Sequence, residues 1–144
     1  LIMLKNIAIS LSLLFITSSA FSATLAEKEL QQKFEENIQS RVMDLNKSCN
    51  TNIKVVFDWS AFSADDLKTI GIDSYCSEGL KGVINTCESS QIAQETVKEK
   101  IENIICSKAT PRSIELKDGT LNFGIDFNAA NDAKAVQEHL MNNL

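Results

Sequence analysis

Four cysteines, Cys49, Cys76, Cys87 and Cys106, constrain the possible folds of this chain more than any other feature. An even number of cysteines is typical of a disulfide framework in an exported protein. Successive cysteines lie 27, 11 and 19 positions apart, so they lack the close pairs that structural zinc sites use. The C-x-x-C redox motif is also missing. We therefore expect two disulfides, and neither a metal centre nor a cofactor.

The start of the sequence, residues 1–23, is typical of a secretory signal peptide. Lys5 is the one charged residue before an apolar run at 7–16, and small residues follow it. That run is about half as long as the roughly 20 residues that a membrane-spanning helix needs, and no later segment is long and apolar enough either. We expect export and cleavage, which leaves residues 24–144 as a single domain. The expected compartment is the periplasm for a Gram-negative bacterium, and otherwise the extracellular space.

Helical periodicity distinguishes among the three possible ways of pairing the cysteines. One predicted helix carries both Cys76 and Cys87. At 1.5 Å per residue they lie about 16 Å apart, whereas a disulfide needs Cα atoms within about 7 Å. A second predicted helix, from about residue 90 to 105, separates Cys87 from Cys106 in the same way. The pairing that remains is Cys49 with Cys87 and Cys76 with Cys106.

Helix-start signals and apolar stripes predict five helices in all. Thr24 and Glu27 form a capping box before the first helix, which we expect to end near Asn46. Ser63 begins a short helix that stops at Gly71. The inward stripes of the last two helices comprise Ala93, Val97, Ile101, Ile104 and Ile105, and then Ala133, Val136, Leu140 and Leu144.

A β-hairpin over residues 113–127 is the clearest local signal in the chain. The dipeptide Asp118-Gly119 stands between two alternating runs. It is typical of a two-residue turn, because both central residues of such a turn need a positive φ. The turn sets the register of the apolar face, with Leu116 opposite Leu121 and Ile114 opposite Phe123.

The fold class follows from the order of these elements. A further alternating strand at residues 53–59, with Trp59 facing the core, brings the number of predicted strands to three. The order α-β-α-α-α-β-β-α predicts a small two-layer α+β domain. In it, a three-stranded antiparallel sheet packs its apolar face against the helices, and two disulfides hold the layers together.

Charge excludes some functions and suggests one. The chain has 19 acidic and 14 basic side chains, a net charge of -5, which argues against binding to nucleic acid. Five acids at 58–78 are opposed by Lys68 alone: Asp58, Asp65, Asp66, Asp73 and Glu78. Helix capping and a solvated face would explain them. Our functional hypothesis is instead an exported, non-enzymatic protein of the inhibitor or immunity type, which binds a basic protein through these acids.

Two alternative functions remain compatible with the sequence. A small hydrolase would use these acids or His139, the chain's one histidine, although neither a G-x-S-x-G motif nor a phosphate-binding loop accompanies them. A carrier would hold an apolar small molecule between the sheet and the helices.

Overall fold

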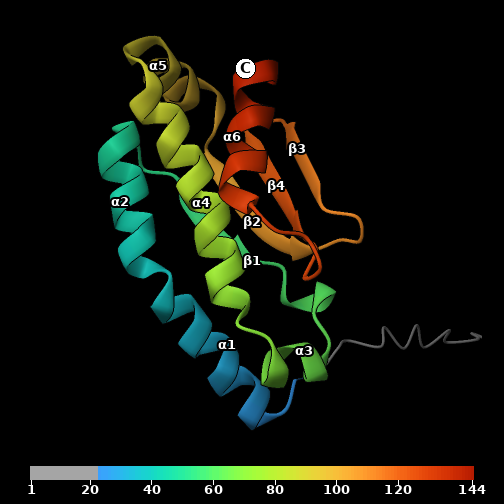
Figure 1. Cartoon of the computed structure of the whole chain (residues 1–144). Coiled ribbons are helices and arrows are strands. Elements are labelled where there is room, and N and C mark those ends of the chain that lie inside the picture. The colour runs from blue at the N-terminus through green and yellow to red at the C-terminus, as the bar shows by residue number, and fades with distance from the viewer. Residues whose placement is uncertain (1–22) are drawn as a thin grey trace, which may run out of the picture.

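A computed structural model describes residues 23–144, so the expected signal peptide lies, except for Ala23, outside the described residues. The described part contains helices packed on one sheet (Figure 1). Its elements are α1 (Leu25–Asn37), α2 (Gln39–Cys49), β1 (Lys54–Phe57), the 3-10 turn η1 (Trp59–Ala61), α3 (Ala64–Thr69), α4 (Ile72–Ser89), α5 (Gln91–Lys100), β2 (Asn103–Lys108), β3 (Ser113–Lys117), β4 (Thr120–Ile125) and α6 (Asp132–Asn143).

The expected capping box begins the first helix. The Glu27 backbone N–H donates to Thr24 Oγ1 at 3.2 Å, and the Thr24 backbone N–H donates to Glu27 Oε2 at 3.1 Å, so two otherwise unbonded N–H groups are satisfied. The long helix that we expected to end near Asn46 is instead two helices, divided at the buried Ile38, and it continues to Cys49.

The sheet has four strands and is mixed, which corrects the expected three-stranded antiparallel sheet. Its strand order is β1-β2-β4-β3, with β1–β2 and β2–β4 parallel and β3–β4 antiparallel. The additional strand is β2, whose residues the sequence placed at the end of a helix. That helix, α5, ends at Lys100, because the following segment takes up main-chain hydrogen bonds from strands on both sides. Burial in the sheet thus outweighs the helical spacing of the apolar residues.

The predicted hairpin is confirmed. Asp118 and Gly119 both have positive φ, 51° and 78°, as the two-residue turn requires. The register places Leu116 opposite Leu121 and Ile114 opposite Phe123, as the alternating pattern indicated. Local turn chemistry and side-chain alternation therefore determine this part of the sheet.

Helix α4 packs against the inner face of the sheet and contacts α2, α5 and α6 (Figure 1). Its glycines allow this close packing. A Cβ added to Gly79 would lie 2.4 Å from the ring of Phe123 in β4, and one added to Gly82 would lie 2.5 Å from the main-chain oxygen of Ala133 in α6. The layer between α4 and the sheet is therefore filled by side chains.

Two disulfides connect α4 to its neighbours, with the pairing expected from the sequence. Cys49 in α2 is bonded to Cys87, and Cys76 is bonded to Cys106 in β2. The paired Cα atoms lie 5.2 and 5.8 Å apart, and all four cysteines are buried. Among residues 23–144, none of the helices combines the length and the apolar character needed to cross a bilayer.

Candidate functional site

Three parallel strands end at the same edge of the sheet, and charged residues stand at each of their ends. Asp58 follows β1, Lys108 is the last residue of β2, and Asp126 follows β4. Helix α3 lies at this end of the molecule, as do the beginning of α4 and the 3-10 turn (Figure 1). We call this region the acidic end and define it by the five acids that the sequence singled out: Asp58, Asp65, Asp66, Asp73 and Glu78.

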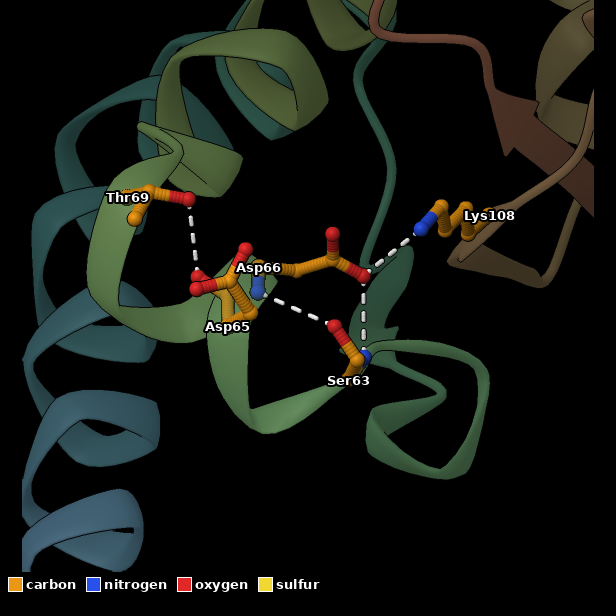
Figure 2. Close-up of polar contacts among 5 residues, drawn as sticks. All are labelled: Ser63, Asp65, Asp66, Thr69 and Lys108. Carbon is orange, nitrogen blue, oxygen red and sulfur yellow. Dashed lines mark hydrogen bonds and ion pairs between the residues drawn. The ribbon is translucent and has the colours of Figure 1, made fainter.

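Asp66 is the most buried of these acids and forms an ion pair across the structure. Its Oδ2 lies 2.8 Å from Lys108 Nζ and accepts a hydrogen bond from the Ser63 backbone N–H at 2.9 Å. The Asp66 backbone N–H in turn donates to Ser63 Oγ at 3.1 Å, which completes the capping box of α3. Figure 2 shows the Asp66 carboxylate between Ser63 and Lys108. The hydrogen-bonding capacity and the charge of this carboxylate are therefore used by contacts inside the fold.

The surroundings of Asp66 change its titration. Burial alone would raise the pKa of the Asp66 carboxyl group. The hydrogen bond from Lys108, the two hydrogen bonds of Ser63 and the charge of Lys108 outweigh burial and hold the pKa below its ordinary value. Asp66 is thus a carboxylate at neutral pH, and its negative charge is neutralised by Lys108.

Asp58 and Asp65 are exposed and belong to the same short segment as Asp66. The Asp58 carboxylate accepts hydrogen bonds from the backbone N–H and the hydroxyl of Ser60, which stabilises the turn η1. At Asp65 it is the main-chain oxygen that accepts a bond, from the Thr69 hydroxyl at 2.8 Å (Figure 2). Of the three aspartates in this segment, Asp65 therefore contributes the least to local structure and leaves its charge facing solvent.

Asp73 and Glu78 lie on different sides of α4. Five residues of helix separate their directions by about 140°. Asp73 accepts a hydrogen bond from Asn37 Nδ2 of α1 at 2.9 Å. Glu78 lies beside a hollow of about 280 Å3 that it lines together with Tyr75 and the segment 129–132. Asp73 therefore faces α1 and Glu78 faces the segment before α6, so the five acids do not form one patch around Asp66.

Aromatic rings form a connected cluster beneath the acidic end. Trp59 stacks on Phe57 at 4.5 Å and on Phe34 at 6.2 Å, measured between ring centroids. The cluster continues through Phe62, Phe127 and Tyr75. Trp59, which the sequence assigned to the core, is only partly buried, and its Nε1–H donates to Glu35 Oε1 at 2.8 Å. It therefore presents part of a rigid aromatic side chain next to Asp58.

A second, partly buried ion pair joins Arg112 to Asp132 at the start of α6. Arg112 Nη1 donates to Asp132 Oδ1 at 2.8 Å and to the main-chain oxygen of Ala130 at 2.9 Å. Asp132 is 5% exposed, so the pair fixes the start of α6 against the loop before β3. Its charges neutralise each other, so this pair adds no net charge to the region.

His139 is not brought near the acids. It lies in the second half of α6, whose carboxyl end is at the opposite end of the molecule from α3 (Figure 1). Within residues 23–144, no group of three or more His, Cys, Asp and Glu side chains is arranged to hold a metal ion. The acids and His139 therefore do not form one site in the described part of the chain.

The larger hollows lie at the surface and are polar. One of about 690 Å3, at the amino ends of β1 and β2, is lined mainly by asparagine, lysine, threonine and glutamate side chains. The space in which an apolar cargo would sit, between α4 and β4, is occupied by the ring of Phe123 against Gly79. The carrier interpretation gains no support from this packing.

Lys108 is the residue of this candidate site that sequence reasoning missed. It lies 42 positions from Asp66 in the sequence. The two meet because β2, which ends at Lys108, pairs with β1, and the chain runs from β1 through η1 into α3, which contains Asp66. Its Nζ also lies 5.2 Å from the centre of the Phe127 ring, so it connects the ion pair to the aromatic cluster. A strand assignment for residues 103–108 would have been the signal that placed Lys108 at the same edge as Asp58.

No protein-family model, curated protein or solved structure matches this chain.

Proposed function

We propose that this chain is an exported, non-enzymatic binding protein that docks on a basic partner protein through its acidic end. Inhibitors and immunity proteins are the functional class that this description fits. The observation that carries the proposal is that the acids differ in environment. Asp66 is neutralised by Lys108 inside the fold, while Asp58 and Asp65 of the same segment remain exposed.

The excess of acidic over basic side chains at this end favours a positively charged partner. Lys68 is the one basic residue between residues 58 and 78. Lys108, which the fold places next to this segment, is paired with Asp66. The exposed carboxylates therefore retain a negative field outside the protein. Such a field accelerates association with a basic surface and loses strength as salt increases.

The aromatic cluster supplies the apolar part of such an interface. Trp59 is held between Phe34 and Phe57 and by its hydrogen bond to Glu35, so binding would cost it little conformational entropy. Partly exposed tryptophans surrounded by charged residues are frequent energetic centres of protein interfaces. Trp59, which follows Asp58 in the chain and donates to Glu35, has this arrangement.

Export agrees with the chemistry of the chain. Two buried disulfides fit a protein that folds in an oxidising compartment. We assign that compartment to the periplasm if the source is a Gram-negative bacterium, and otherwise to the extracellular space. Cleavage of residues 1–23 belongs to the same proposal.

The test compares two charge reversals of equal size. Asp65→Lys changes the acidic end without touching the Asp66–Lys108 pair, and Glu99→Lys makes the same change on the exposed side of α5. Each oxidised protein is used as bait against an extract of the native compartment. The partner retained by the wild type and by Glu99→Lys should be lost with Asp65→Lys.

Binding to the identified partner is then measured at increasing ionic strength. We expect the dissociation constant to rise with salt for the wild type and to depend less on salt for Asp65→Lys. Equal loss of binding in both variants would point to net charge instead of this surface. Unchanged binding with Asp65→Lys would remove the acidic end as the docking site.

A further inference from the structure

Strand β1 lies at an edge of the sheet and has main-chain groups directed away from it. The backbone N–H groups of Lys54 and Asp58 donate to carbonyl oxygens of β2 at 3.2 and 2.9 Å. In a parallel ladder, alternate residues bond to the same neighbour. The N–H and C=O groups of Val55 and Phe57 therefore point toward the open edge.

No hydrogen bond among residues 23–144 uses these outward groups of Val55 and Phe57. A hollow of about 230 Å3 runs along them, lined by residues 55–57 and by Glu35, Ile38 and Gln39. Val56, in the middle of the strand, is 52% exposed. An edge with free main-chain groups, adjoining space and an exposed apolar side chain is suited to pairing with another strand.

The other edge of the sheet is protected differently. Strand β3 carries Glu115 and Lys117 on the outer face, and both are exposed. Charged side chains along an edge discourage pairing with further strands. At the corresponding central position β1 has Val56, so β1 is the edge that we consider.

The sequence of β1 is complementary to itself. Its residues read Lys54-Val55-Val56-Phe57-Asp58. If two copies run antiparallel with Val56 opposite Val56, Lys54 of each copy lies opposite Asp58 of the other. Lys54 and Val56 share the exposed face of β1, and Asp58, the next residue in this alternation, follows the strand directly. In the paired arrangement the opposite charges of Lys54 and Asp58 would be cross-strand neighbours.

The hydrogen bonds select the same register. It places Val55 opposite Phe57 of the second copy, and these are the residues whose main-chain groups point outward. Directly opposite residues of that kind exchange both of their N–H···O bonds in an antiparallel pair. The opposite charges and the outward main-chain groups thus favour the same arrangement, in which a two-fold axis passes beside Val56.

We propose that the β1 edge binds a second copy of this chain and joins two sheets into one continuous sheet. The interface is isologous, because each copy contributes the same strand. The acidic ends of the two copies then face opposite directions, and Asp58 of each copy lies in the interface. Asp58 is common to this inference and to the proposed function, but the tests are separate, because Asp65→Lys leaves the β1 edge unchanged and Val55→Pro leaves the acids unchanged.

The test uses charge reversals that should cancel only if the two strands pair in this way. Lys54→Glu places two acids opposite each other, and Asp58→Lys places two lysines opposite each other. Each variant alone should raise the dimer dissociation constant about tenfold. A mixture of the two variants restores opposite charges at both positions, so it should form a heterodimer. Sedimentation velocity of the oxidised protein, made from the complete chain, measures these species.

Two further variants separate pairing from folding. Val55→Pro removes an outward N–H group and leaves the ladder to β2 intact, since proline is tolerated on the free side of an edge strand. It should abolish the dimer while the monomer stays folded, with the far-UV circular dichroism of the wild type and a cooperative melting transition. Lys134→Glu, an exposed charge reversal on α6, should leave the dimer unchanged. Melting curves of all variants verify that they are folded.

Three outcomes would overturn this inference. The first is a wild-type protein that stays monomeric over the whole accessible concentration range. The second is a dimer that neither Lys54→Glu nor Val55→Pro weakens, which would point to another surface such as the β3 edge. The third is a β1 edge that pairs with a strand of a different, co-purified protein, because the edge would then not bind a second copy of this chain.

Discussion

Lys108 Nζ lies 2.8 Å from Asp66 Oδ2, and this ion pair connects the carboxyl end of β2 to the first turn of α3. The two side chains are 34% and 12% exposed, so the pair is shielded on the side of the carboxylate. A carboxylate in this position depends on its cation more than an acid at the surface does. Several properties of the acidic end follow from this contact.

Removal of the cation should destabilise the protein measurably. Lys108→Met keeps most of the aliphatic side chain but leaves the Asp66 carboxylate without its partner. We expect the free energy of unfolding to fall by about 1–2 kcal/mol, as measured by urea denaturation. Lys134→Met is the control, because its pair with Glu138 is exposed and 3.7 Å long, and it should change stability by less than about 0.5 kcal/mol. Equal effects of the two substitutions would contradict the role assigned to Lys108.

The same ion pair predicts a pH dependence. The pKa of Asp66 is lower in the folded protein than in the unfolded chain, so its carboxylate stabilises the fold above the unfolded pKa of about 3.9. That contribution is lost as the pH falls through the folded pKa. Urea unfolding of the wild type and of Asp66→Asn over this pH range should give a stability difference that shrinks toward acid. A difference independent of pH would show that the Asp66 charge plays no part.

The contact between α4 and β4 predicts a strong size limit at Gly79. A methyl group there would meet the ring of Phe123 at 2.4 Å, and the crowded layer has little room to adjust. Gly79→Ala should therefore lower the free energy of unfolding by about 1–3 kcal/mol. Gly71→Ala is the matched control, since its nearest neighbour would be 3.7 Å away. Thermal melting of both variants measures the difference, and a Gly79→Ala variant as stable as Gly71→Ala would refute the packing argument.

The disulfides should each contribute substantially to stability. They close loops with sequence separations of 38 and 30 residues, which corresponds to about 4 kcal/mol each in the chain-entropy model. The double variants Cys49→Ala/Cys87→Ala and Cys76→Ala/Cys106→Ala should both unfold at lower urea concentration than the wild type. Because all four cysteines are buried, the native protein should also resist reduction until it unfolds. Rapid reduction under native conditions would show that the bridges are accessible.

The sequence was most informative where the deciding interactions are local. The capping residues Thr24 and Ser63 and the Asp118-Gly119 turn act within a few positions of themselves, and the structure has all three as expected. The cysteine pairing was also predictable, because a helix keeps Cys76 and Cys87 too far apart to bond. The α+β class followed from these elements together.

Strand β2 could not be predicted in the same way. Val97, Ile101 and Ile104 are spaced like one face of a helix, and only the first of them lies in a helix. What makes residues 103–108 a strand is the presence of β1 and β4 on either side, both distant in sequence. Lys108 was missed for the same reason, so the main error in the candidate site came from the error in the sheet.

The position of β2 also has a kinetic consequence. Within residues 23–144, the β3–β4 pairing alone is closed by a tight turn, whereas β2 must enter between two strands that run in its own direction. Pairing Lys54 with Asn103 requires closing a long stretch of chain first, and such steps slow folding. A refolding chain whose Cys76–Cys106 bond is intact starts with β2 tethered to α4. It should therefore reach the native state faster than the reduced chain.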